Sequence, residues 1–161
     1  MCHRVALAIA TIAAIGAAIT CGACTEVENQ AAPDPAAALD EAVFKCSVEP
    51  ILAKQCSYNG CHGIAGTALR VYTPGKLRAI TPATLDQAIL PLTTDEEHAN
   101  FESASAFSFG GVAPADNFLA RKPLPSAAGG FEHKGGAIYS GKSDAQYAAI
   151  DAWLSGSGAC P

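Results

Sequence analysis

The sequence predicts an all-α domain that begins and ends with a helix, with a long, loop-rich middle between the two. An apolar stripe with helical spacing opens the domain, and a second stripe of the same kind closes it. Between them glycine and proline recur, and no alternating apolar run is long enough to indicate a strand. The chain has 161 residues, which is enough for one such domain behind a leader segment.

The first helix is predicted to begin at about residue 40. Asp40 and Glu41 stand where the positive end of its dipole would be. Pro50 predicts either a kink or the start of a second helix. The apolar stripe consists of Val43, Phe44, Val48, Ile51 and Leu52.

The middle of the chain predicts two short helices among loops. Residues 81–92 favour a helix that starts after a Thr-Pro pair and is broken at Pro91. Residues 93–104 favour another helical turn, with Thr93 or Thr94 as its cap. The glycine- and proline-rich stretches up to residue 135 predict loops.

The last helix has clear start and stop signals. Ser143 is the expected N-cap, with Gln146 three residues later as in a capping box. Gly156 is the expected terminator. The apolar face consists of Tyr147, Ile150, Trp153 and Leu154.

A cysteine pair is predicted to join the two ends of the domain. Cys160 stands in a glycine-rich tail, and Cys46 lies in the first helix without a nearby partner. If the first and last helices cross, the two cysteines can form a disulfide. The closed loop would stabilise the fold by on the order of 4 kcal/mol in the chain-entropy description.

The first residues indicate an export signal, which we assign to residues 1–23. Its apolar run of Ala, Ile, Val and Leu is shorter than the ~20 residues of a membrane-spanning helix, and small residues follow it. A retained membrane anchor is the alternative. Residues 24–39 are polar with several alanines and prolines and predict a flexible tether, and residues 40–161 form the domain. The expected location is the periplasm or cell envelope.

The number of cysteines that remain after cleavage, odd or even, indicates where the export signal is cleaved. Cleavage before Cys24, which follows two small residues, leaves that cysteine for a lipid and four others that can pair. Cleavage before Cys21 would leave an odd thiol in an oxidising compartment. We therefore expect a lipid on Cys24, with Cys21 and simple cleavage and release as alternatives. The lipid is the only membrane contact that we expect.

The formal net charge is −5, with no basic run and no interleaving of basic and aromatic residues. Nucleic acid is therefore excluded as a partner, because its binding depends on Lys and Arg neutralising phosphates.

Cys56, Cys61 and His62 form the motif with the most chemical content. Two thiols can add to the two vinyl groups of a haem, and a histidine directly after the second thiol presents its nitrogen to the iron. The usual spacing has two residues between the cysteines, whereas this chain has four. Three alternatives remain: a Cys56–Cys61 disulfide with an incidental His62, a zinc site that lacks a fourth ligand, and a nucleophilic cysteine without an evident base.

Three stretches in this order resemble small bacterial c-type cytochrome domains, of the lipoprotein kind seen in myxobacteria and planctomycetes. They are VEPILAKQCSYNGCHG, NFLARKPLPSAAGGFEHKGGAIY and YAAIDAWLSGSGAC, and together they span roughly residues 41–160. The resemblance implies a cytochrome c-like fold in which the first and last helices cross, which agrees with the predicted disulfide. The motif departs from the family's usual pattern in its longer cysteine spacing.

A methionine ligand to the iron is excluded, because Met1 is the only methionine and lies in the leader. His133 is the expected second ligand, since glycines on both sides let the backbone approach a flat macrocycle and the family has a histidine there. His98, in an acidic polar run, is the alternative ligand. If neither histidine binds, the iron has an open position.

The expected function is electron transfer between redox partner proteins, through one covalently bound haem c with its iron held by His62 and His133. Catalysis is not expected, because two protein ligands leave no room for a substrate. Phe44, Tyr72, Phe118 and Trp153 are the aromatic residues expected to screen the haem or to pack in the core. Two alternatives stay open: a haem enzyme or sensor with an open distal site, and a haem-free, disulfide-bonded lipoprotein with an interaction role.

Overall fold

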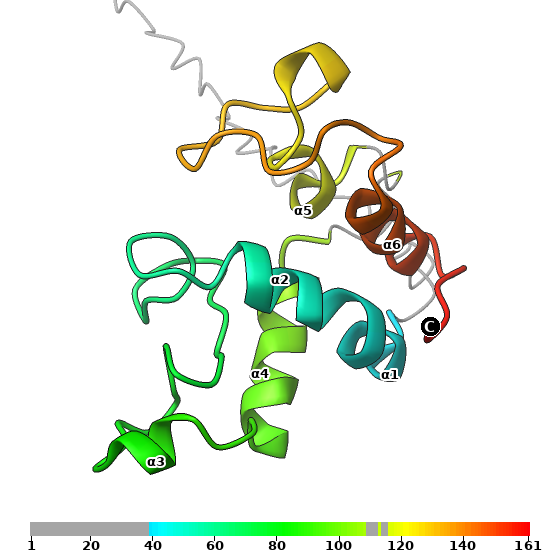
Figure 1. Cartoon of the computed structure of the whole chain (residues 1–161). Coiled ribbons are helices and arrows are strands. Elements are labelled where there is room, and N and C mark those ends of the chain that lie inside the picture. Colours follow the sequence, from blue (N-terminus) through cyan, green and yellow to red (C-terminus); the bar gives the residue numbers. More distant parts are fainter. Residues whose placement is uncertain (1–38, 109–112, 114–115) are drawn as a thin grey trace, which may run out of the picture. The chain divides into compact units, whose positions relative to one another are not determined.

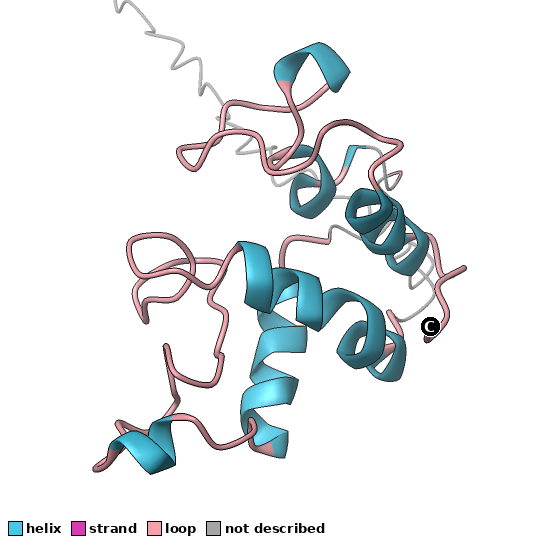
Figure 2. Cartoon of the chain, in the orientation of Figure 1, coloured by secondary structure: helices cyan, strands magenta, loops and turns pink. Residues whose placement is uncertain are grey.

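The computed structural model describes residues 39–108, 113 and 116–161 (Figure 1). Every regular element in these residues is a helix and none is a strand, as predicted (Figure 2). The predicted export signal and nearly all of the predicted tether, with Cys21 and Cys24, lie outside the described residues. Within the described part no helix is long and apolar enough to cross a membrane. In chain order the helices are α1 (Glu41–Val43), η1 (Phe44–Val48), α2 (Glu49–Gln55), α3 (Leu85–Ala88), α4 (Thr94–Ser105), α5 (Phe118–Arg121), η3 (Ser126–Ala128) and α6 (Ala145–Leu154).

The helices α1, η1 and α2 follow one another without a break. Asp40 caps the first of them, since its side chain accepts a hydrogen bond from the Val43 N–H at 3.0 Å. η1 is a π-helical turn in which the Glu49 N–H donates to the carbonyl of Phe44, five residues earlier. Pro50 is the second residue of α2, and the wider turn before it accommodates a ring that would clash inside a regular α-helix. The sequence left two possibilities at Pro50, a kink or the start of a new helix. The structure has a π-helical turn directly before the helix that contains Pro50.

The first and last helices pack against each other around Phe44, which is fully buried. Its ring centroid lies 5.2 Å from that of Trp153 on α6 and 5.7 Å from that of Phe101 on α4. The Trp153 indole N–H donates to the backbone carbonyl of Asp40 at 2.9 Å. One aromatic cluster therefore joins η1, α4 and α6 in the core.

Cys46 and Cys160 lie at disulfide distance, with their sulfur atoms 2.02 Å apart and their Cα atoms 5.4 Å apart. This is the pair that the sequence predicts. The link joins η1 to the tail that follows α6, across a sequence separation of 114 residues.

The start of α6 differs from the prediction by one residue. Asp144, and not Ser143, is the N-cap, and its side chain accepts from the Gln146 N–H at 2.9 Å. The same carboxylate accepts from the Ser140 N–H at 3.2 Å, which fixes it in the capping position. Gly156 has a φ of 71°, the left-handed conformation expected of a helix terminator. Three of the four predicted face residues are buried, and the fourth is half-buried: Tyr147, Ile150, Trp153 and Leu154.

The helices of the middle segment begin where threonines cap them. Thr84 caps α3, so this helix starts later than the Thr-Pro pair suggested. Thr93, one of the two predicted caps, forms a complete capping box with Glu96 at the start of α4. α4 has 12 residues and nearly coincides with the stretch 93–104 that the sequence predicts to be helical. α5 and η3 were not predicted, because a helix of four or three residues has no readable periodicity.

Candidate functional site

The stretch from Cys56 to Gly63 folds into a tight loop directly after α2. The carbonyl of Tyr58 accepts hydrogen bonds from the N–H groups of Cys61 at 2.9 Å and Gly63 at 3.1 Å. The His62 N–H donates to the carbonyl of Cys56 at 3.1 Å, which returns the histidine to the end of α2. The four residues between the cysteines therefore close into a turn, and the longer spacing does not separate Cys56 from His62.

Two further contacts hold this loop. A Cβ atom at Gly63 would collide with the backbone carbonyl of Ser57, so the close approach requires glycine. The Lys76 ammonium donates to the Ser57 hydroxyl at 2.8 Å and lies 4.0 Å from the centroid of the Tyr58 ring. The loop is thus held at its base, while residues 58–61 on its outer side are exposed.

Both cysteines of the loop are free thiols in the structure. Cys56 is buried, and burial, together with the neighbouring Cys61, raises its pKa to about 11. Cys61 is exposed. Neither thiol is used in a disulfide, so both remain available for bonds to a third group.

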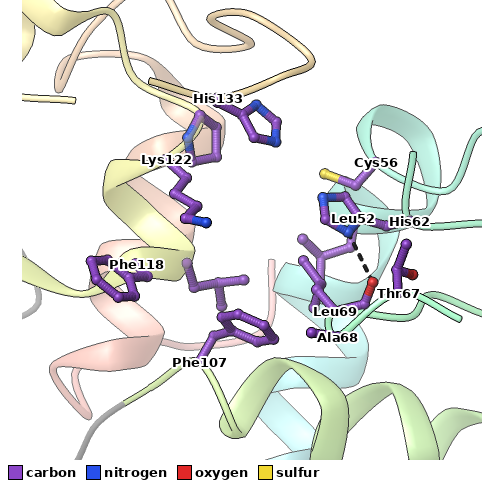
Figure 3. Close-up of a pocket in the computed structure, with 12 residues that line it drawn as sticks. Leu52, Cys56, His62, Thr67, Ala68, Leu69, Phe107, Phe118, Lys122 and His133 are labelled. Carbon is purple, nitrogen blue, oxygen red and sulfur yellow. Dashed lines mark hydrogen bonds between the residues drawn. The ribbon is translucent and has the colours of Figure 1, made fainter. Parts of the chain in front are cut away.

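The orientation of His62 is fixed by its backbone surroundings. Its Nδ1 lies 2.8 Å from the carbonyl oxygen of Leu69 (Figure 3). A carbonyl only accepts, so Nδ1 carries the hydrogen and Nε2 keeps a free lone pair. Such a hydrogen bond also makes an imidazole a better metal ligand.

α4 holds the segment that supplies the Leu69 carbonyl. The Arg70 N–H donates to the Ser103 hydroxyl at 2.8 Å, and the Tyr72 N–H donates to the Asn100 side chain at 2.7 Å. The Asn100 amide donates in turn to the Tyr72 carbonyl at 3.0 Å and to the buried Glu49 carboxylate at 2.8 Å. α2 and α4 therefore position His62 from both of its sides.

His133 has the same kind of support on a different segment. Its Nδ1 lies 3.0 Å from the carbonyl oxygen of Gly136, which again leaves Nε2 free. The segment turns back on α5, since the Phe131 N–H donates to the Arg121 carbonyl at 3.3 Å and the Ile138 N–H donates to the Pro123 carbonyl at 2.8 Å. This return places His133 opposite the loop that carries His62.

The rings of His62 and His133 lie next to each other with nearly parallel planes. Their centroids lie 6.0 Å apart and their planes are within 6° of parallel. A metal–imidazole nitrogen bond is ~2 Å long. Because a ring centroid lies about 1 Å behind its nitrogen, two imidazoles on opposite sides of one metal ion have centroids roughly 6 Å apart. The spacing of the pair thus matches that of two ligands to a single metal ion.

Next to the pair lies a cavity of about 230 Å³, which we call the inner cavity (Figure 3). α2 and the segment around Leu69 form one wall, and α5 with the residues after it forms the other. The walls are mostly apolar, which suits a flat hydrophobic ligand. The lining residues are Leu52, Cys56, His62, Thr67, Ala68, Leu69, Phe107, Phe118, Leu119, Lys122, Pro123 and His133.

A second, outer cavity of about 540 Å³ adjoins the first. The two share His62, Thr67, Lys122 and His133, so together they make one slot that passes the histidine pair. Cys56 lines the inner part and Cys61 the outer part. The remaining outer lining is Gly60, Ile64, Glu132, Lys134 and Gly135.

The other predicted site residues lie elsewhere. His98 is exposed on α4, where it contacts Glu41 at 3.2 Å and Glu102 at 3.5 Å, and it does not line either cavity. Of the four aromatic residues expected to screen a haem or pack in the core, only Phe118 lines the inner cavity. Phe44 and Trp153 pack in the core instead, because they hold η1 against α6.

Sequence reasoning missed several wall residues, among them Leu69, Phe107 and Lys122. They stand in loops or beside very short helices, where no periodic pattern marks an inward side chain. Leu52 is the exception, since it belongs to the predicted apolar stripe of the first helix.

No protein-family model, curated protein or solved structure matches this chain. In the described part no group of three or more His, Cys, Asp or Glu side chains could hold a metal ion. The site offers two imidazoles with free Nε2 atoms, two free thiols and apolar walls. This set of groups fits a covalently attached haem, whose own nitrogens would complete the coordination of the iron.

Proposed function

We propose that this chain is an electron-transfer protein that carries one c-type haem. Cys56 and Cys61 would form the thioether bonds, and His62 and His133 would bind the iron. The observation that carries the proposal is the parallel imidazole pair, 6.0 Å apart, beside two free thiols in a slot with apolar walls. The bound haem would supply a one-electron couple between ferric and ferrous iron.

Each residue of the site has a defined part in this function. The carbonyls of Leu69 and Gly136 hold the Nδ1 hydrogens, so both histidines present Nε2 and resist rotation. The apolar side chains of the inner cavity lower the local polarity beside the histidines. Two rigidly held histidine ligands would move little when the charge of the iron changes, which favours fast electron transfer.

The ligand set also predicts the direction of the reduction potential. Two imidazoles favour ferric iron more than a histidine and a methionine do, so the potential should lie below that of a His/Met cytochrome. If His62 and His133 both bind the iron, no iron position would be left for a substrate, and electron carriage between redox partner proteins is the function that we propose.

The fold is compatible with a cytochrome c-like arrangement, which forms part of the same proposal. The support consists of the helical structure, the packing of η1 on α6 and the position of the cysteine motif directly after the first helical stretch. Export and a lipid on Cys24 also belong to the proposal and rest on the sequence.

Absorption spectroscopy of protein produced with haem-maturation machinery tests the proposal. After denaturation in alkaline pyridine, the wild type should give the band of haem with two thioether bonds. Cys56→Ser and Cys61→Ser should each displace that band towards free haem, and the double variant should lose the bound chromophore. A colourless wild type, purified after successful maturation of a control cytochrome, would refute the proposal.

A further inference from the structure

Lys122 stands apart from the other residues that line the inner cavity. Among the described residues of that lining it has the one charged side chain besides the histidines. It follows directly after α5 and is exposed. Figure 3 shows its side chain reaching into the cavity below His133, from the wall opposite Cys56. It lines the outer cavity as well, so its ammonium group stands where the two parts of the slot meet.

The neighbouring Arg121 shows the contrast. Its guanidinium group donates to the Gly129 carbonyl at 3.0 Å, pairs with Asp116 at 3.4 Å and lies 3.9 Å from the ring centroid of Phe131. In the described part of the chain no carboxylate forms an ion pair with Lys122. Its ammonium group lies 5.7 Å from the ring centroid of Phe118. Arg121 thus has its hydrogen-bond and charge partners within the protein, whereas the side chain of Lys122 is directed at the slot.

We propose that Lys122 binds a carboxylate of the group that fills the slot. The inference rests on the proposed function and adds the orientation of the ligand: a haem has its acidic propionates at the edge opposite its vinyl groups. Cys56 stands on one wall of the cavity and Lys122 on the other. A haem bonded to Cys56 and Cys61 by its vinyl edge would therefore turn its acidic edge towards Lys122. A charge-assisted hydrogen bond is the interaction that this pair of groups makes.

Such a pair has a consequence that a purely structural lysine would not have. An adjacent ammonium group lowers the pKa of a carboxylate, so the propionate stays ionised over the usual pH range. The positive charge of Lys122 then offsets part of the negative charge of the propionate. Without the lysine the propionate charge is uncompensated, which favours ferric iron. The propionate pKa also rises, so its protonation becomes coupled to the reduction potential at mildly acidic pH.

The test compares matured Lys122→Gln with Lys134→Gln, a matched control from the outer cavity. Each variant removes one exposed lysine charge from the slot. Potentials are measured by mediated redox titration from pH 5 to pH 8, and haem content is measured by absorbance. Lys122→Gln should raise the ratio of ferric to ferrous protein at a fixed ambient potential at least threefold. At 59 mV per tenfold change in this ratio, that corresponds to a reduction potential lower by roughly 30 mV. Its potential should become steeper with pH below neutrality, and Lys122→Arg should restore the wild-type profile.

Lys134→Gln should change the ratio less than Lys122→Gln and leave the pH profile unchanged. Equal effects of the two glutamine variants, or an unchanged pH profile in Lys122→Gln, would overturn the role of Lys122 while haem attachment still stands. Absence of haem in all variants and in the wild type would overturn the proposed function, and this inference with it.

Discussion

His62 and His133 are the residues on which the account depends, and each gives its Nδ1 hydrogen to a backbone carbonyl. The two carbonyls belong to different loops, so the tautomer of each ring is set independently. Two imidazoles 6.0 Å apart and held in the same tautomer leave two Nε2 lone pairs free in one slot. Hydrogen-bonded surface histidines would not need this matched arrangement.

Replacing His133 by alanine should open one axial position of the iron. Carbon monoxide added to the ferrous wild type should leave the spectrum unchanged, because His62 and His133 would occupy both positions. In His133→Ala the same addition should shift the main absorption band, since carbon monoxide takes the vacant site. His98→Ala is the matched control and should behave as the wild type does, because His98 lies on the exposed face of α4. A carbon monoxide shift in the wild type would contradict ligation by His133.

Several of these residues could be predicted from the sequence for local reasons. Cys56, Cys61 and His62 stand together in one motif, and His133 is flanked by glycines. The partners that orient them could not be predicted. The carbonyl of Leu69 acts through the path of the backbone, and any residue at position 69 would supply the same atom. Lys122 has no local signal either, because its direction depends on how α5 packs.

At the scale of elements, the loop after α2 keeps Cys56 and His62 close together despite the longer cysteine spacing. The Tyr58 carbonyl gathers the N–H groups of Cys61 and Gly63, so the two additional residues are taken up within a turn. The glycine at position 60 has a φ of 84°, which suits this turn. The sequence shows only the wider spacing, because the hydrogen bonds that close the loop depend on its three-dimensional path.

Gly63→Ala should disrupt this loop, because the added methyl group would meet the Ser57 carbonyl. We expect several-fold less haem per protein, measured from absorbance and protein concentration after maturation. Gly66→Ala is the control, since a Cβ at Gly66 would have nothing within 4 Å and the substitution should change little. Equal haem content in both variants would show that the loop tolerates a different path.

The segment between α3 and α4 is held by a buried ion pair. The Arg78 guanidinium contacts both carboxylate oxygens of Glu96 at 2.9 and 2.8 Å and also donates to the Leu90 carbonyl at 2.9 Å. The hydrogen bonds from Arg78, together with those from the Thr93 and Ala79 N–H groups, lower the Glu96 pKa from its ordinary 4.5 to about 2. These bonds fix the start of α4, the helix that also positions the segment next to His62.

This ion pair predicts a pH dependence of stability. Because the Glu96 pKa is lower in the folded state, the pair stabilises the fold above pH 4.5, and the contribution is lost as the pH falls towards 2. Glu96→Gln should reduce the free energy of unfolding at pH 7 by up to about 3 kcal/mol, and the difference should shrink at pH 3. Urea unfolding at both pH values measures it. Glu97→Gln, which removes a half-exposed partner of Lys45, should cost less than about 1 kcal/mol. A pH-independent loss in Glu96→Gln would contradict this role.

Element boundaries were predictable only where caps and stripes are strong. Thr93 is one of the two caps that the sequence predicts for α4, and in the structure it forms a capping box with Glu96. The cap of α6 was misplaced, because Ser143 and Asp144 are both good caps and only the contact of Asp144 with Ser140 distinguishes them. α4 lies within one residue of the predicted stretch at both ends, although its inward side chains include polar residues such as Asn100 that interrupt the apolar pattern.

At the scale of the domain, its two ends are joined by aromatic packing and by the Cys46–Cys160 pair. Few other regular elements lie between them, and much of the middle is loop. A link near both ends restricts the unfolded chain strongly because the closed loop is long. The all-helical class was predictable from the two terminal stripes, whereas the slot was not, since loops from distant parts of the chain form its walls.

Removing the link in Cys46→Ser/Cys160→Ser should lower the free energy of unfolding by about 4 to 5 kcal/mol, as expected for a closed loop of this length. Urea unfolding of oxidised wild type and double variant gives the difference, and the reduced wild type should resemble the variant. A loss below about 1 kcal/mol would show that the two ends hold together without the bond.

The most direct test of the central claim is mass spectrometry of the purified, matured protein, intact and after digestion. The account predicts a mass increase of one haem, located on the peptide that contains both Cys56 and Cys61, with the Cys46–Cys160 peptides unmodified and linked. An unmodified chain in which Cys56 is bonded to Cys61 would contradict it.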